Sequence, residues 1–210
     1  MITLYTWTTG NSRKATIMME ESGLPYELRP VDIRKNEQLA PEYVKISPNH
    51  TVPAIVDDDA PGGRRAVFES GAVLIYLAEK SGKFLAPSGP RRDQALAWLF
   101  WASSTFGQAH TTWRHFATRT GDKITDEIER LANDHLRALT LMERRLNEEP
   151  YLAGDYSIAD MAAFPRARNA LPEFRKEHGD MIGPTPGIDR WLKAIESRPA
   201  VQRALTIPKA

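Results

Sequence analysis

The fold is decided by the stretch Thr51-Val52-Pro53-Ala54-Ile55-Val56-Asp57, followed by a turn through Ala60-Pro61-Gly62-Gly63 and by Val67-Phe68-Glu69-Ser70-Gly71. This pattern predicts a strand led in by a proline, a hairpin turn, and a second short strand that ends where a helix begins. A proline gives no N–H to a ladder, and a tight lead-in is one of the few places that tolerate a cis peptide bond. If the Val52-Pro53 bond is cis, the N–H and C=O of Val52 turn outward. They then offer an edge to an extended, peptide-like ligand.

Ser70 is expected at the N-cap of the helix that follows, over residues 70–81. A serine hydroxyl together with the free N–H groups of a first helical turn makes an anion site. A backbone edge beside a carboxylate pocket suits a small peptide that carries a free carboxylate.

Composition places the chain among ordinary globular proteins. It has 210 residues, 41% of them hydrophobic, and a formal net charge of +1, which gives no indication of nucleic-acid or membrane binding. No apolar run approaches the roughly 20 residues of a membrane span, and the chain opens on a strand instead of a signal peptide, so we expect a cytoplasmic protein. The sequence contains no cysteine. Any thiol chemistry must therefore come from a bound cofactor.

The order of expected elements predicts two domains, with a linker at 83–90 that is rich in proline and glycine. Residues 1–82 alternate in the order β-α-β-α-β-β-α, which is the thioredoxin-like pattern of an α/β domain. Residues 91–210 are expected to be entirely helical. One helix is indicated by Ile124, Ile128, Leu131, Leu139, Met142 and Leu146, and another begins with a capping box formed by Ser157 and Asp160.

Several of these segments resemble the cytosolic glutathione transferases. The resemblance is carried by Ser47-Pro48-Asn49, Val52-Pro53-Ala54-Ile55-Val56, Phe68-Glu69-Ser70-Gly71-Ala72 and Ile75-Tyr76-Leu77, and the capping box extends it to the helical half. Thr9-x-Asn11, Gln38 and Trp98-Leu99-Phe100-Trp101 are similar to the bacterial nu-class transferases and their fungal prion-regulator relatives. The resemblance implies a homodimer that binds glutathione as co-substrate and uses no metal.

The loop after the first strand is where we expect help for the glutathione thiol. A free thiol has a pKa of about 8.5, so only about 3% is thiolate at pH 7, and a shift of about 2 units requires about 2.7 kcal/mol. One or two hydrogen-bond donors aimed at sulfur would supply this. The candidates are Thr9, Asn11 and Ser12. The alternative is that they only shape the turn and cap the helix.

The resemblance also implies a set of glutathione contacts. The backbone of Val52, next to Pro53, would pair with the cysteinyl residue, while Glu69 would hold the γ-glutamyl amine and Ser70 its carboxylate. Weaker contacts to the glycyl end are assigned to Gln38 and His50, because position 51, often basic in relatives, is a threonine here. Arg130 matches a position from which nu-class relatives reach glutathione across the dimer interface.

An electrophile pocket is expected around Phe106, His110 and Trp113. Aromatic residues at helical spacing are more often core, and that alternative stays open. The segment Ser103-Ser104-Thr105-Phe106 stands where the nu-class relatives have a glycine-rich segment, so the resemblance leaves open both the substrate class and any disulfide-reductase activity. None of the five histidines has convincing spacing for a metal site.

The expected function is therefore that of a glutathione transferase, which ionises bound glutathione and conjugates it to a small hydrophobic electrophile. One alternative is a glutathione-dependent reductase of disulfides or peroxides at the same site. Another is a non-catalytic relative that keeps the fold as an interaction or regulatory module.

Overall fold

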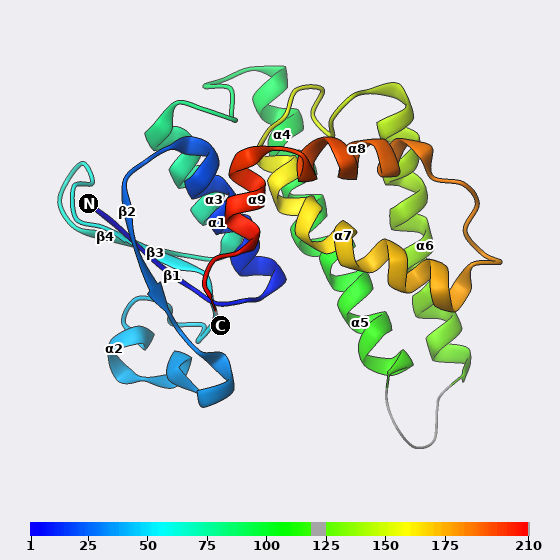
Figure 1. Ribbon diagram of the computed structural model, residues 1–210, viewed down its shortest axis with the longest axis horizontal. Coiled ribbons are helices and arrows are strands. Elements are labelled where there is room, and N and C mark those ends of the chain that lie inside the picture. The colour runs from blue at the N-terminus through cyan, green and yellow to red at the C-terminus, as the bar shows by residue number, and fades with distance from the viewer. Residues whose placement is uncertain (119–124, 210) are drawn as a thin grey trace. The chain divides into compact units, whose positions relative to one another are not determined.

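The computed structural model describes residues 1–118 and 125–209, which form two compact units. The first unit contains Met1–Arg92 and the segment from Glu196 onward, and the second is Asp93–Ile195. The first unit holds a four-stranded sheet with helices, and the second is built of helices (Figure 1). This confirms the predicted fold class. The predicted domain limits, 1–82 and 91–210 with a linker at 83–90, stay a prediction.

The first unit has the predicted order β-α-β-α-β-β-α. The sheet runs β2-β1-β3-β4, in which β1 and β2 are parallel and the other neighbours antiparallel. Its elements are β1 (Ile2–Thr6), α1 (Gly10–Ser22), β2 (Tyr26–Pro30), the short 3-10 turns η1 (Ile33–Lys35) and η2 (Glu37–Leu39), α2 (Pro41–Val44), β3 (Ala54–Asp57), β4 (Arg65–Phe68) and α3 (Ser70–Ser81).

Two boundaries differ from the prediction. The strand expected from residue 51 begins only at Ala54, which pairs with Tyr5 of β1, because Pro53 has no N–H to enter the ladder. The helix expected between the second strand and the proline-led strand is split into η2 and a single turn of α2, which starts at Pro41. Both corrections leave an irregular segment between α2 and β3.

The two faces of the sheet carry separate cores. On one face, Ile2 and Leu4 of β1 are buried, as are the facing sides of α1 and α3, which pack against each other. On the other face, a smaller cluster is packed against η1 and α2. Figure 1 labels α2 beside the sheet. The cluster contains Trp7, Val31, Tyr43, Val52 and Ala54. The side chains alternate along the strands, so one short β1 supplies both cores.

The C-terminal helix α9 (Pro199–Leu205) belongs to the first unit and packs on α1. Arg198 donates to both carboxylate oxygens of Glu21, at 2.5 and 3.0 Å, and Arg203 donates to Glu20 at 2.7 Å. Arg13 donates to the carbonyl oxygen of Ala204 at 2.8 Å. The C-terminal segment thus holds both ends of helix α1.

The second unit is organised around a buried capping box. Its elements include most of α4 (Pro90–Phe100), a π-helical segment η3 (Trp101–Phe106), α5 (Gly107–Ala117), α6 (Thr125–Glu148), α7 (Ile158–His178) and most of α8 (Pro186–Glu196). Ser157 caps α7 as predicted, and Asp160 accepts hydrogen bonds from the N–H groups of Leu152 and Ser157, both at 3.0 Å, and from Nε1 of Trp191 at 2.8 Å. One carboxylate therefore ties the start of α7 to α8.

The core of this unit is a stack of aromatic and histidine rings. His135 of α6 lies between Phe106 and Trp113, nearly parallel to both, with centroid distances of 5.7 Å to each. Within the described residues, neither ring nitrogen of His135 has a hydrogen-bond partner. Burial lowers the pKa of His135 to about 3 and that of neighbouring His110 to about 4. The predicted apolar positions Leu131, Leu139, Met142 and Leu146 are also buried, whereas Ile124 lies outside the described residues.

Among the helices of the described ranges, none combines the length and the apolar character that a membrane crossing requires.

The buried imidazole of His135 makes the stability of this unit sensitive to acid. Unfolded histidine binds a proton below its ordinary pKa of 6.5, whereas folded His135 does so only near 3. Unfolding therefore takes up a proton between these values, and the free energy of unfolding falls as the pH falls. We expect His135→Phe to be more stable than the wild type by a margin about 2 kcal/mol wider at pH 5 than at pH 7. Urea unfolding followed by circular dichroism at both pH values measures the margin.

The matched control is His115→Phe, which changes an exposed histidine of α5. Its side chain meets solvent in both states, so its margin should be the same at both pH values. An equal margin for His135→Phe at pH 5 and pH 7 would contradict the prediction.

Candidate functional site

The loop after β1 presents Thr9 and Asn11 and buries Ser12. Thr9 is the N-cap of α1, where its Oγ1 accepts the Ser12 N–H at 3.1 Å. The two hydroxyl oxygens are 3.0 Å apart, and Ser12 Oγ also accepts the Trp7 N–H at 3.2 Å. Thr9 is partly exposed and Asn11 exposed, but Ser12 is 0% exposed. On this unit, Thr9 and Asn11 can meet a ligand, whereas the Ser12 hydroxyl faces the interior of the loop.

The proline-led segment forms the expected backbone edge. The Val52-Pro53 bond is cis, which is the case that the sequence left open. The carbonyl oxygen of Thr51 accepts hydrogen bonds from the hydroxyl of Tyr43 at 2.6 Å and from that of Ser47 at 2.9 Å. Burial raises the pKa of Tyr43 to about 12, which keeps this hydroxyl a donor. Within the described chain, no hydrogen bond involves the N–H or C=O of Val52.

The edge and the loop are neighbours, because Val52 and Trp7 share the smaller core cluster. A ligand on the edge therefore lies near the loop that presents Thr9.

The start of α3 differs from the prediction in one position. The N-cap is Glu69, and Ser70 is the first helical residue, because the chain enters the helix through the left-handed conformation of Glu69, with φ 68° and ψ 121°. No side chain caps this end, and the first backbone bond of the helix runs from Val73 N–H to Glu69 C=O at 2.9 Å. The N–H groups of Ser70, Gly71 and Ala72 stay available for an anion.

Glu69 combines strain with a fixed carboxylate. A non-glycine residue in such a conformation costs about 1–3 kcal/mol and is typical of functional positions. Asn49 Nδ2 donates to Glu69 Oε1 at 3.2 Å, which orients the exposed carboxylate. The expectation that Glu69 has a functional role gains support from this geometry.

The two weaker contacts lie at the α2 side of the unit. Gln38 is half-buried, and its Oε1 is buried with no hydrogen-bond partner among the described residues. His50 is exposed, also with a positive φ of 55°. A buried amide oxygen without a partner is rare in folded proteins.

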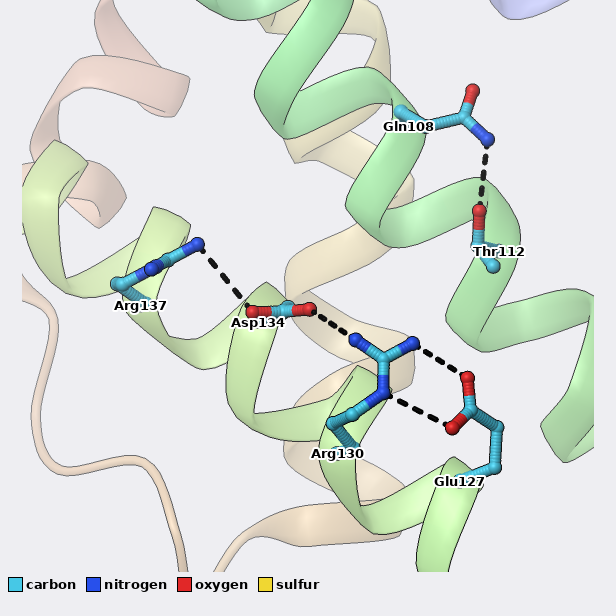
Figure 2. Close-up of polar contacts among 6 residues, drawn as sticks. All are labelled: Gln108, Thr112, Glu127, Arg130, Asp134 and Arg137. Atoms are coloured by element: carbon cyan, nitrogen blue, oxygen red, sulfur yellow. Dashed lines mark hydrogen bonds and ion pairs between the residues drawn. The ribbon is translucent and has the colours of Figure 1, made fainter. Parts of the chain in front are cut away.

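Arg130 lies on α6 in the second unit, where it is exposed and paired (Figure 2). It donates to both carboxylate oxygens of Glu127, at 3.0 and 2.5 Å, and to Asp134 at 3.2 Å. Asp134 also accepts from Arg137 at 3.4 Å. Figure 2 shows this row of charges on α6 beside α5, whose own Gln108 Nε2 donates to Thr112 at 2.9 Å. The reach of Arg130 to a partner's glutathione stays a prediction.

The residues assigned to an electrophile pocket lie in the core of the second unit. Phe106, His110 and Trp113 are 0, 2 and 1% exposed. Phe106 and Trp113 stack on His135, His110 lies tilted against it, and Trp113 meets Phe174 edge to face. This burial favours the core interpretation, and none of the three is carried into the candidate site. Within the described ranges, no group of three metal-binding side chains is close enough to hold an ion.

Comparison with known proteins now identifies the family. The family model for the glutathione S-transferase N-terminal domain matches residues 10–80. The disulfide-bond oxidoreductase YfcG of Escherichia coli K12 is 40% identical over 208 residues, which cover 98% of this chain and 94% of that protein. The chain belongs to the glutathione S-transferase family. The resemblance stated from the sequence is thereby confirmed.

Two solved structures of transferases superpose on almost the whole chain. One, from Pseudomonas fluorescens with two glutathione molecules bound, is 37% identical with a TM-score of 0.91 and covers 99% of this chain and 93% of its own. The other, from Pseudomonas putida with one glutathione disulfide bound per subunit, is 36% identical with the same TM-score and covers 99% and 91%.

Sequence reasoning missed the residues that fix the backbone edge at Val52. Tyr43 and Ser47 fix the Thr51 carbonyl, but only Ser47 was noted, as part of a motif and without a role. The signal is the spacing of four between Tyr43, Ser47 and Thr51, which brings two hydroxyls back onto one carbonyl. Trp7 was missed as well, because its backbone N–H and not its ring contacts Ser12.

The strain at Glu69 predicts an unusual ranking of variants. We expect Glu69→Gly to be more stable than Glu69→Ala by about 1 kcal/mol, because glycine adopts a positive φ without penalty. Urea unfolding of the two variants measures the difference.

The same pair of substitutions at Glu79, inside α3, is the control. There the order should reverse, with glycine less stable than alanine by about 1 kcal/mol. Equal stabilities at position 69 would show that the residue is not strained in solution.

Proposed function

We propose that this transferase-family chain binds glutathione on its first unit and reduces disulfide bonds with it. The observation that carries the proposal is the unpaired backbone of Val52, next to the open N-terminus of α3 and the Thr9 loop, in a chain without cysteine. Glutathione supplies the thiol: two molecules transfer two electrons and two protons to one disulfide and leave as glutathione disulfide, while the substrate leaves as two thiols. The protein's own residues bind, orient and stabilise charge.

The N–H and C=O of Val52 would pair with the backbone of the cysteinyl residue, as in strand addition. The γ-glutamyl carboxylate would take the hydroxyl of Ser70 and the N–H groups of the first turn of α3, where the helix dipole favours an anion. The γ-glutamyl ammonium would pair with Glu69. At the other end, Gln38 and His50 would meet the glycyl residue.

Thr9 and Asn11 would donate hydrogen bonds to the sulfur. A hydrogen bond to a charged group contributes about 1.5–3 kcal/mol, which corresponds to a pKa shift of about 1–2 units for the thiol. Two such donors supply the stabilisation that a reactive thiolate at neutral pH requires. No covalent bond to the enzyme is needed, and the rate gain comes from positioning and charge stabilisation.

The relatives support reduction as the reaction. YfcG is named a disulfide-bond oxidoreductase, and the Pseudomonas putida transferase holds glutathione disulfide. Conjugation to an electrophile, the first expectation from the sequence, is the second candidate, because family membership favours it equally. Both reactions use the same thiolate, so the substrate decides between them.

Calorimetric titration of glutathione, paired with absorbance near 240 nm for bound thiolate, tests the binding step. Turnover is then compared among a mixed disulfide, a hydroperoxide and an aryl halide. We expect the disulfide to exceed the aryl halide by about tenfold or more in kcat/KM, about 1.4 kcal/mol in transition-state free energy. The reverse order would favour conjugation. An absence of binding at millimolar glutathione would overturn the enzymatic proposal and favour a non-catalytic module.

Site variants make the same test specific. Thr9→Ala should lower kcat/KM at pH 7 by about tenfold or more, since it removes a donor to the thiolate. Glu69→Gln should weaken glutathione binding, whereas Glu79→Gln, on the exposed side of the same helix, should not. Equal affinities for the two glutamine variants would remove Glu69 from the site.

The homodimer and the role of Arg130 belong to the same proposal. Arg130 and Arg137 lie on one helix and share the carboxylate of Asp134 (Figure 2), so they form a matched pair. We expect Arg130→Ala to weaken glutathione binding by about fivefold and Arg137→Ala to leave it within about twofold. Calorimetry measures both, with sedimentation velocity to show that each variant keeps the oligomeric state of the wild type. Equal losses would mean that Arg130 acts only within the surface charge network of α6.

A further inference from the structure

Ser12 is the polar residue of the loop whose role the glutathione contacts leave unexplained. We propose that Ser12 is a positioning residue, which commits the Thr9 hydroxyl to donate its hydrogen to the glutathione sulfur through a relay that starts at the Trp7 N–H. This inference rests on the proposed function. It replaces a direct contact of Ser12 with sulfur, since the side chain is 0% exposed.

The relay consists of three contacts within one turn of chain. Trp7 N–H donates to Ser12 Oγ at 3.2 Å, the two hydroxyl oxygens of Ser12 and Thr9 lie 3.0 Å apart, and Ser12 N–H donates to Thr9 Oγ1 at 3.1 Å. The structure has this contact donated by Thr9 to Ser12. A hydroxyl can rotate, so the same pair of oxygens can also be bridged by the hydrogen of Ser12.

The count of donors and acceptors selects the second arrangement when a thiolate is present. A hydroxyl has one hydrogen and two lone pairs. If Ser12 donates to Thr9, both lone pairs of Thr9 Oγ1 are occupied, one by the Ser12 N–H and one by the Ser12 O–H. The hydrogen of Thr9 then has no partner in the loop and can only be donated outward. Thr9 is partly exposed, so this direction leads to the surface of the loop.

Burial makes the relay effective. The interior has a low dielectric. In a chain of hydrogen bonds the groups polarise one another, which strengthens each bond by about 10–30%. Among the described residues, the Trp7 N–H has no other hydrogen-bond acceptor. Without Ser12 it would be an unsatisfied buried donor. The N-terminus of α1, a helix of 13 residues, adds positive potential at Thr9.

A purely structural role makes a different prediction. If Ser12 only satisfies the Trp7 N–H and the first turn of α1, its removal lowers stability without changing the acidity of bound glutathione. If it positions the Thr9 hydroxyl, its removal raises the pKa of the bound thiol, and only while Thr9 is present.

A double-mutant cycle separates the two roles. The thiol pKa of bound glutathione is measured from absorbance near 240 nm against pH in the wild type, Ser12→Ala, Thr9→Val and the double variant. We expect Ser12→Ala to raise this pKa by about half a unit, about a threefold loss of thiolate below the pKa. In the Thr9→Val background Ser12→Ala should add nothing. An equal shift in both backgrounds, or none in either, would overturn the inference.

A measurement on the wild type covers the case in which Ser12→Ala does not fold. The amide proton of Trp7 is the first member of the relay, so its NMR chemical shift should titrate with the pKa of the bound thiol. S-Methylglutathione, which has no ionisable thiol, is the control and should leave the shift flat with pH. A Trp7 amide that ignores the thiol titration would contradict the relay.

These outcomes are separate from the failure of the proposed function. No binding of glutathione, or binding without thiolate, overturns the function itself. Binding with thiolate that does not respond to Ser12 overturns the relay alone and leaves Thr9 and Asn11 as independent donors.

Discussion

The candidate site depends on the two hydrogen bonds that hold the carbonyl of Thr51. Tyr43 and Ser47 both lie in the buried side of the α2 region, and together they fix the backbone one residue before Val52. Because the Thr51 carbonyl points inward, the polar groups of Val52 are left without partners, at the point where β3 has not yet begun. A regular strand from residue 51 would have consumed these groups in the sheet. The irregular lead-in is what makes an edge for a peptide-like ligand.

A chain without cysteine can act on thiols only by arranging a thiol that it binds. Three features of the first unit are ones that ordinary folding preferences would not select. Glu69 holds a positive φ at the start of α3, Gln38 keeps a buried oxygen unpaired, and Ser12 spends a buried hydroxyl on the loop of Thr9. The strain at Glu69 and the unpaired oxygen of Gln38 cost stability, as is typical of functional positions, whereas Ser12 satisfies the buried Trp7 N–H.

The sequence predicts the order of elements and the capping box well, because each depends on neighbours within a few residues. Two features escaped prediction. Whether Phe106, His110 and Trp113 line a pocket or a core is decided by His135 and Phe174, which come from other helices. The N-cap of α3 is Glu69 and not Ser70, because the helix starts at a residue with strained backbone. Such strain leaves no mark in the sequence when the residue is not glycine.

The proposed site would act on the sulfur and on the γ-glutamyl end through interactions of different range. The loop from Trp7 to Ser12 contains no charged side chain, so its effect on sulfur comes from oriented dipoles at hydrogen-bond distance. Such short-range terms are little affected by salt, whereas the pairing of the exposed Glu69 with an ammonium is screened over about 8 Å at physiological ionic strength. In the proposed site, binding and activation of glutathione would thus be governed by different interactions, and raising the ionic strength should weaken affinity while leaving the acidity of the bound thiol nearly constant.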